Sequence, residues 1–126
     1  MAYAFFRNND SVTQFLGMVV RAVPVGQCLL AQADVDADAA NLLGIRLSDV
    51  LPGASDTIGS FQVPGTRIRM DAAPRSGDPV YLSAAIAGVG TTTAPALKIP
   101  LGICYAAVNI GGVDYADVVP PVPGTT

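Results

Sequence analysis

Residues 74–119 read PRSGDPVYLSAAIAGVGTTTAPALKIPLGICYAAVNIGGVDYADVV, and this stretch decides the fold class. Short runs of β-branched and aromatic residues alternate with turns rich in Gly, Pro, Asp and Ser. Gly111-Gly112, between two apolar runs, is a strong signal for a two-residue hairpin. We therefore expect a compact antiparallel unit of about four strands, near residues 80–83, 91–93, 101–108 and 113–119.

The chain before residue 74 continues this pattern. Further strands are expected near residues 12–23, 27–32, 60–63 and 66–71, and Gly17 inside the first of them indicates a bulge or the close approach of another backbone. A short turn of helix is expected at residues 41–43, closed by Gly44. The total of about eight to ten short strands favours an all-β fold, an antiparallel β-sandwich or barrel of jelly-roll-like type.

The organisation of the chain is that of a single domain, since 126 residues bury one core. Leu43-Gly44-Ile45 recurs as Leu101-Gly102-Ile103, and glycine-led turns at Gly26 and Gly77 precede apolar strands. These echoes suggest two degenerate β-units, about residues 12–73 and 74–119, within a domain that spans residues 11–119.

The two ends of the chain are the predicted contact regions. Residues 1–10 form either an N-terminal arm that packs on a neighbouring subunit or a first strand whose aromatic residues enter the core. Residues 120–126 form an extended Pro-rich tail, because proline does not donate to a β-ladder. Contacts with another subunit or with a larger assembly are expected at Tyr3, Phe5, Phe6, Val118, Val119, Pro120 and Pro121.

The composition is poor in charge. Charged residues make up 13% of the chain, against about a quarter in ordinary soluble domains, which suggests a surface that is buried against something else. No signal peptide and no apolar membrane span are recognisable, so synthesis in a cytoplasm is expected. The net charge of −3 speaks against nucleic-acid binding. Arg67 and Arg69 share a strand face that is either solvated, in a salt link between subunits, or in contact with an anion or nucleic acid.

The residues for catalysis are missing. The chain has no His and no Glu, which excludes a histidine base and leaves only Asp pairs for acid–base chemistry. Asp114 and Asp117, the best such pair, are three apart on one strand and point to opposite faces. Two cysteines are too few for a structural zinc site, and no phosphate-binding loop is present. We expect no enzyme, no cofactor and no small-molecule substrate.

Two further groups of residues are expected to have structural roles rather than binding or catalytic ones. Asp34, Asp36 and Asp38 begin like a calcium loop, but Ala39 and Ile45 stand where that loop needs Gly and Glu, so turn formation is favoured over a weak cation site. Cys28 and Cys104 lie in apolar runs and are expected to be buried, reduced thiols.

One family resemblance is present. Gly77-Asp78, then Val80-Tyr81-Leu82-Ser83, a Thr-rich segment at residues 91–93, and Gly102-Ile103 resemble small β-rich structural proteins of tailed bacteriophages, most of all the capsid decoration (cement) proteins. The resemblance covers about a third of the chain. It implies a homotrimer on the outer surface of the virion that binds the major capsid protein.

Two other functions stay open. A phage tail, baseplate or fibre component has similar composition. A carbohydrate-binding β-sandwich requires exposed aromatic platforms, for which Tyr81, Tyr105 and Tyr115 are the candidates.

Overall fold

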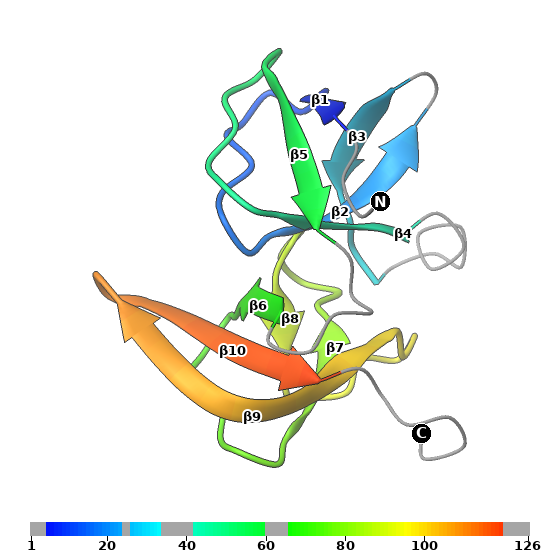
Figure 1. Ribbon diagram of the computed structural model, residues 1–126. Helices are drawn as coiled ribbons and strands as arrows, with labels where there is room; N and C mark the ends of the chain where they lie inside the picture. The colour runs from blue at the N-terminus through cyan, green and yellow to red at the C-terminus, as the bar shows by residue number, and fades with distance from the viewer. Residues whose placement is uncertain (1–4, 24–25, 34–41, 60–65, 120–126) are drawn as a thin grey trace.

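The computed structural model describes residues 5–23, 26–33, 42–59 and 66–119, which form strands, turns and irregular loops (Figure 1). The strands are β1 (Phe5–Asn8), β2 (Val19–Val23), β3 (Gln27–Leu30), β4 (Leu42–Arg46), β5 (Ser55–Gly59), β6 (Thr66–Arg69), β7 (Pro79–Leu82), β8 (Gly90–Thr91), β9 (Pro100–Ile110) and β10 (Val113–Val119). Within these ranges no helix occurs. The all-β fold class is confirmed.

The first unit, β1 to β5, is a closed five-stranded barrel. β1 pairs in parallel with β3 and antiparallel with β5, while β2 pairs antiparallel with both β3 and β4. Residues 5–8 are therefore held in the barrel as a strand, but of the two aromatic residues in it only Phe6 packs inward, whereas Phe5 is exposed. β2 is shorter than the expected strand at residues 12–23, because Met18 N donates to Phe15 O (3.0 Å) and closes a turn in which Gly17 has φ +84°.

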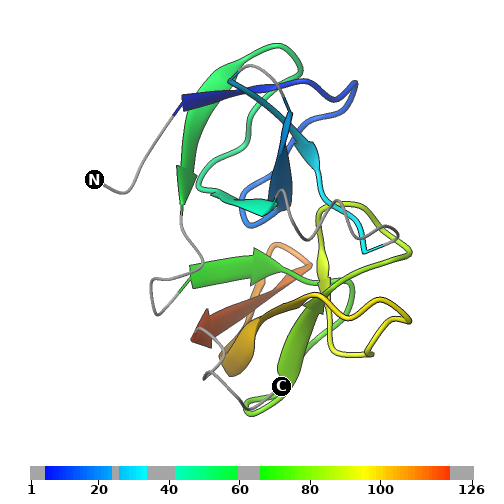
Figure 2. The ribbon, with the colours of Figure 1, turned by 90° about the vertical axis from the view of Figure 1, so that its right-hand side faces the viewer.

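The second unit, β6 to β10, is a sheet with the order β6-β10-β9-β7-β8. β9 and β10 form the expected hairpin around Gly111-Gly112. Met70, directly after β6, forms a parallel bridge with Gly90 in β8, so the two ends of this sheet also approach each other. Figures 1 and 2 show the two units stacked, with β1 to β5 above β6 to β10.

The two units repeat one topology. Followed around the barrel from β1, the first unit has the order β1-β5-β4-β2-β3, and the second has β6-β10-β9-β7-β8. Each strand of the first unit thus corresponds to the strand numbered five higher in the second unit. The parallel contact also corresponds: β1 pairs with β3 in the first unit, and Met70 after β6 pairs with Gly90 of β8 in the second. The division lies between Gly59 and Thr66, not near residues 73 and 74, because β6 pairs with β10 and belongs to the second unit.

The repeated Leu-Gly-Ile motif lies at counterpart positions, meaning residues that take the same place in the two pairing patterns. Gly44 pairs with Val20, and Gly102 pairs with Val80. In both ladders the register shifts directly after the valine, between Val20 and Arg21 and between Val80 and Tyr81. A Cβ at Gly102 would lie 2.5 Å from Val119 O, and one at Gly44 would collide with the matching oxygen of Gly59. Glycine is needed at both places because another strand passes too closely for a side chain.

This pairing overturns two sequence expectations. Residues 42 and 43 belong to β4, so the expected helical turn at 41–43 does not form in this part of the chain. The counterpart of Gly77 is Gly17, not Gly26. Gly17 N donates to Arg46 O at 2.9 Å, and Gly77 N donates to Cys104 O at 2.7 Å, whereas Gly26 precedes β3.

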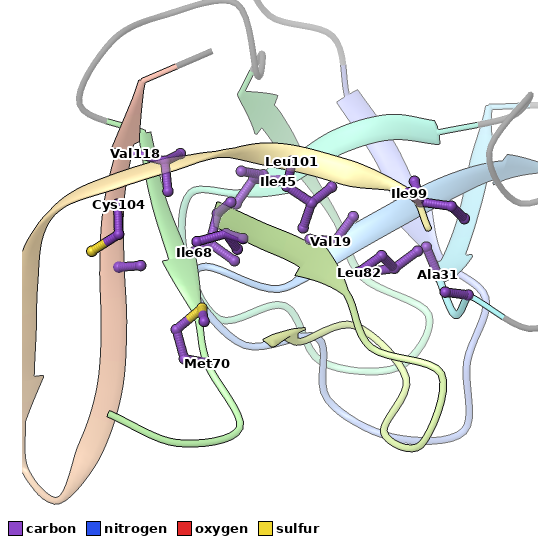
Figure 3. Close-up of a cluster of buried hydrophobic side chains, with 13 residues drawn as sticks. Val19, Ala31, Ile45, Ile68, Met70, Leu82, Ile99, Leu101, Cys104 and Val118 are labelled. Carbon is purple, nitrogen blue, oxygen red and sulfur yellow. The ribbon is translucent and has the colours of Figure 1, made fainter. Parts of the chain in front are cut away.

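Both units contribute to one hydrophobic core (Figure 3). Val19, Ala31 and Ile45 of the first unit pack with second-unit residues that include Ile68, Met70, Leu82, Ile99, Leu101, Cys104 and Val118. Backbone hydrogen bonds join the units as well: Gly88 O accepts from Val19 N and Gly88 N donates to Ala31 O, both at 2.7 Å. The interface between the repeats is therefore the centre of the molecule.

Candidate functional site

The most distinctive chemical group of the first unit is a buried guanidinium. Arg46, at the end of β4, is fully buried. Its Nε donates to Gln14 Oε1 (2.8 Å), one terminal nitrogen donates to Asp56 O (2.9 Å), and the other donates to Phe6 O (2.8 Å) and contacts Cys28 Sγ (3.1 Å). The cation thus ties together strands β1, β3 and β5 and the segment before β2.

Gln14 extends this cluster. Its Nε2 donates to Asp10 Oδ2 (3.0 Å) and to Cys28 O (3.3 Å), and Asp10 Oδ2 also accepts from Leu30 N (2.8 Å). In the described residues every buried side-chain nitrogen and oxygen has a hydrogen-bond partner. The cluster is therefore satisfied by the protein itself, as a buried polar network must be if it is to stabilise a fold.

The electrostatics of the cluster favour a structural role. Burial lowers the pKa of Arg46, and Cys28 and Asp56 oppose that shift. An arginine nevertheless stays protonated in proteins. Burial raises the pKa of the Cys28 thiol, and the neighbouring Arg46 offsets only part of the effect. Cys28 is thus a neutral thiol at physiological pH, and the thiolate that nucleophilic chemistry needs is disfavoured.

The second unit fills the same positions with apolar residues. The counterpart of Arg46 is Cys104, that of Cys28 is Gly90, and that of Asn8 is Met70. Pro74 stands three residues before the turn glycine Gly77, as Gln14 does before Gly17, and Ala116 takes the place of Asp56. Because the same strand arrangement forms without polar groups, the Arg46 cluster is a property of the first unit and not a requirement of the topology.

A second candidate is a set of exposed apolar side chains on the first unit. Phe5 is 71% exposed, Leu51 is 66% exposed and Val12 is 54% exposed. The Asn8 side chain donates to Val12 O (3.0 Å) and to Val50 O (2.8 Å), which holds the segments of Val12 and Leu51 beside each other. Phe5 is fixed because β1 is paired with a strand on each side. These three residues, the exposed apolar set, are presented on an ordered scaffold.

The expected contact residues fall into different environments. Phe5 is exposed, but Phe6 is partly buried against Val20, Cys28 and Ile58. Val118 is only 1% exposed and lies in the main core, so the expectation that its side chain contacts another subunit is wrong: β10 turns this residue inward, opposite Cys104. Val119 is half-buried. Tyr3, Pro120 and Pro121 lie outside the described residues.

Sequence reasoning missed Leu51 and Val12. Both lie next to turn residues, Leu51 before Pro52-Gly53 and Val12 after Ser11. A large aliphatic residue at the edge of a turn, where polar residues are usual, is the signal that would have identified them.

The two arginines of β6 have partners within the chain. Arg67 binds Asp117 through two bonds of 2.8 and 3.0 Å, and this contact raises the pKa of Arg67. The Arg69 guanidinium lies 4.9 Å from the centroid of the Phe15 ring. The Arg67 salt link is therefore made within the chain and not between subunits.

The cysteines and the acidic residues were the remaining candidates for a site. Cys28 and Cys104 are buried free thiols, as predicted. Asp34, Asp36 and Asp38 lie outside the described residues, and elsewhere in the described chain no three Cys, Asp, Glu or His residues gather into a metal-binding group. The described part also contains no helix long and apolar enough to cross a membrane.

Comparisons with models of known protein families and with curated protein sequences find no match to this chain. What the protein does must therefore be inferred from its own residues.

Proposed function

We propose that this protein is a virion structural protein that decorates and stabilises the capsid of a tailed phage by binding subunits of the major capsid protein on the outer surface. The sequence resemblance around residues 77–103 suggests the class of protein. The observation that carries the proposal further is the exposed apolar set: Phe5, Leu51 and Val12 are held in place on a closed barrel, yet more than half of each side chain faces solvent.

The energetics fit a contact surface. Covering a large apolar side chain completely contributes about 1.5–3 kcal/mol, so three such residues supply a useful part of a binding free energy. A chain with only 13% charged residues also has few charges to desolvate when it is covered. In the homotrimer that the resemblance implies, several such contacts act together, and their combined strength exceeds that of each one alone.

The buried Arg46 cluster supports this role indirectly. A decoration protein gains from a unit that does not open under the strain of a filled capsid, and a guanidinium bonded to three surrounding segments resists separation of the barrel strands.

A sugar-binding function has less support. Stacking on a sugar ring needs exposed aromatic faces. Tyr115 is buried and Tyr81 is half-buried, which leaves Tyr105 as the exposed member of the three candidates. These tyrosines do not provide a shared platform.

The binding test uses the full chain and capsids that lack it. Phe5→Ser and Leu51→Ser should each weaken cosedimentation with the capsid by about tenfold or more, which corresponds to the loss of one buried apolar side chain. Ile86→Ser is the matched control, since Ile86 is also exposed but lies on the second unit. Unchanged binding by both folded variants would overturn the proposed contact surface.

The location test labels the protein on intact virus particles for electron microscopy. We expect label over the whole head. Label confined to the tail would support the tail, baseplate or fibre alternative instead, and particles without label would remove the virion assignment.

A further inference from the structure

Strand β9 has an open edge at its far end. On one side its residues from Ile103 to Ile110 pair with β10. On the other side, β7 reaches only residue 103, Gly77 and Asp78 bond to Cys104, and Ser76 Oγ donates to Tyr105 O at 3.2 Å. No described residue pairs with the outer side of residues 106–110. In Figure 1 this part of the hairpin extends beyond the other strands of the second unit.

The hydrogen-bonding pattern identifies the backbone groups at this edge. Asp114 O accepts from Met70 N at 2.9 Å, so the backbone groups of Asp114 point away from β9. The pair of Asp114 with Asn109 is therefore a non-hydrogen-bonded pair of the β9–β10 ladder. Because the pattern alternates, Ala107 and Asn109 direct their N–H and C=O groups away from β10, toward the open side.

This edge carries none of the usual protections. Residues 106–110 are Ala-Ala-Val-Asn-Ile, without a charge or a proline. The β9–β10 ladder shifts register between Asp117, which pairs with Ala106, and Val118, which pairs with Cys104. This irregularity comes before residue 106, so residues 106–110 pair regularly with β10. An uncharged, regular edge with unpaired backbone groups is a template for another strand.

The first unit covers the corresponding place with its own chain. There Gln14 and Val50 form an antiparallel bridge, in which Gln14 N donates to Val50 O at 2.9 Å and Val50 N donates to Gln14 O at 2.8 Å. The counterpart of Gln14 in the second unit is Pro74, which has no N–H to donate. The same topology therefore closes this position in one unit and leaves it open in the other.

We propose that residues 106–110 pair antiparallel with the same segment of a second copy of this chain, about a two-fold axis at Val108. In this arrangement Ala107 exchanges two hydrogen bonds with Asn109 of the second copy, and Asn109 exchanges two with its Ala107. The two Val108 side chains face each other across a non-hydrogen-bonded pair. Because the segment is uncharged, self-pairing places no like charges opposite one another. The pairing of the two edges would join the second-unit sheets of the two copies into one continuous sheet. This inference depends neither on the proposed binding to a capsid nor on the homotrimer that the resemblance implies, because the two-fold contact at β9 would be a separate interface.

A cross-linking experiment tests the register. In Val108→Cys the two introduced thiols lie directly opposite, at a Cβ separation of about 4.5–5.5 Å, and mild oxidation should convert the full-length protein into a covalent dimer. Ala107→Cys is the matched control, because residue 107 faces residue 109 and not itself. The native thiols are buried and should not contribute. Absence of a dimer in Val108→Cys, or equal cross-linking in both variants, would overturn the proposal.

A solution experiment tests the hydrogen bonds. Ala107→Pro removes an N–H that points to the open edge, so the hairpin is kept, but two hydrogen bonds across the axis are lost. Self-association measured by sedimentation equilibrium should weaken about tenfold or more, whereas Ala107→Ser should associate like the parent. Circular dichroism verifies that both variants are folded.

Three results would contradict self-pairing. The parent chain could be monomeric at every concentration reached, the proline variant could associate as well as the parent, or an extended segment of another protein could protect this edge while the chain stays monomeric. Each leaves capsid binding through Phe5 and Leu51 untouched, so the two proposals fail separately.

Discussion

Arg46 in β4 and Cys104 in β9 occupy the same position in the two units, since each accepts a backbone hydrogen bond from a turn glycine, Gly17 at 2.9 Å and Gly77 at 2.7 Å. One is a guanidinium held by polar partners, and the other is a thiol in the apolar core. The strand framework therefore accepts either kind of interior. Removing the polar partners singly and removing them together should have different consequences.

Arg46→Met should destabilise the protein strongly. Methionine fills much of the volume but removes the charged donor from Gln14 Oε1, Phe6 O and Asp56 O. Breaking a buried charged network in this way costs about 3–5 kcal/mol. Urea unfolding followed by circular dichroism measures the change in the free energy of unfolding. Arg75→Met, on the surface, is the control and should change that free energy by less than about 0.5 kcal/mol. Equal effects of the two substitutions would show that the Arg46 bonds do not stabilise the barrel.

Gln14→Met and Arg46→Met should be strongly coupled. Once Arg46 is gone, Gln14 Oε1 keeps only the weak thiol donor of Cys28 at 3.4 Å, so replacing Gln14 as well removes a poorly satisfied group instead of creating one. The double variant should be more stable than the sum of the single effects predicts, by about 0.5–3 kcal/mol. A double-mutant cycle in urea gives this coupling energy, and a value near zero would mean that the two side chains act independently.

Several strands followed from local sequence, but β4 and β5 did not: a helical turn was expected at residues 41–43 and no strand at residues 55–59. Gly111-Gly112 between apolar runs predicted the β9–β10 hairpin, and the repeated Leu-Gly-Ile identified two positions that proved to be counterparts. Local signals suffice there because turn residues and strand residues are neighbours in the chain. The pairing of β6 with β10 joins residues about fifty positions apart, and no local signal specifies it. The boundary between the units was misplaced for this reason.

The buried Arg46 cluster could not be predicted from the sequence, because it too depends on contacts between residues that are far apart in the chain. Arg46 ends the strand Leu-Leu-Gly-Ile-Arg, and an arginine at a strand end is ordinarily solvated. Its burial depends on Gln14, Cys28 and Phe6, which come from other parts of the chain and meet only in the closed barrel. Phe5 could be proposed as a contact because a terminal aromatic is visible in the sequence, whereas the direction of Val118 depends on the register of β10.

Gly44→Ala and Gly102→Ala should destabilise the protein by similar amounts. In both, the new Cβ meets the backbone oxygen of the neighbouring strand, Gly59 O or Val119 O, which cannot move without breaking the ladder. Gly26→Ala is the comparison, because Gly26 has φ +66° but no atom within 4 Å of an added Cβ. Its cost should be the conformational one of about 1–2 kcal/mol, and the other two should exceed it. A smaller effect at Gly44 or Gly102 than at Gly26, measured by thermal unfolding, would contradict this account.

The two thiols should make stability depend on alkaline pH. Burial raises the pKa of Cys28 and of Cys104 above the ordinary value of 9.0. The unfolded chain therefore releases these protons at lower pH than the folded one. The thiol contribution to stability is complete below about pH 9 and is lost as the pH rises from there through the folded-state pKa values. Urea unfolding between neutral and alkaline pH should show a decline that is shallower in Cys104→Ala. An identical slope in the variant would mean that Cys104 does not contribute.

Arg67 and Asp117 should contribute far less than Arg46, although they form a bidentate ion pair. The pair is bidentate, at 2.8 and 3.0 Å, but the Arg67 side chain is 37% exposed, so water and salt screen the attraction. We expect a coupling energy of about 0.2–1 kcal/mol from a cycle of Arg67→Gln and Asp117→Asn, falling as salt is added. A coupling as large as that predicted for Arg46 and Gln14, or one that salt does not reduce, would mean that this pair is shielded from solvent. That shielding would place β6 and β10 in an interface with another subunit.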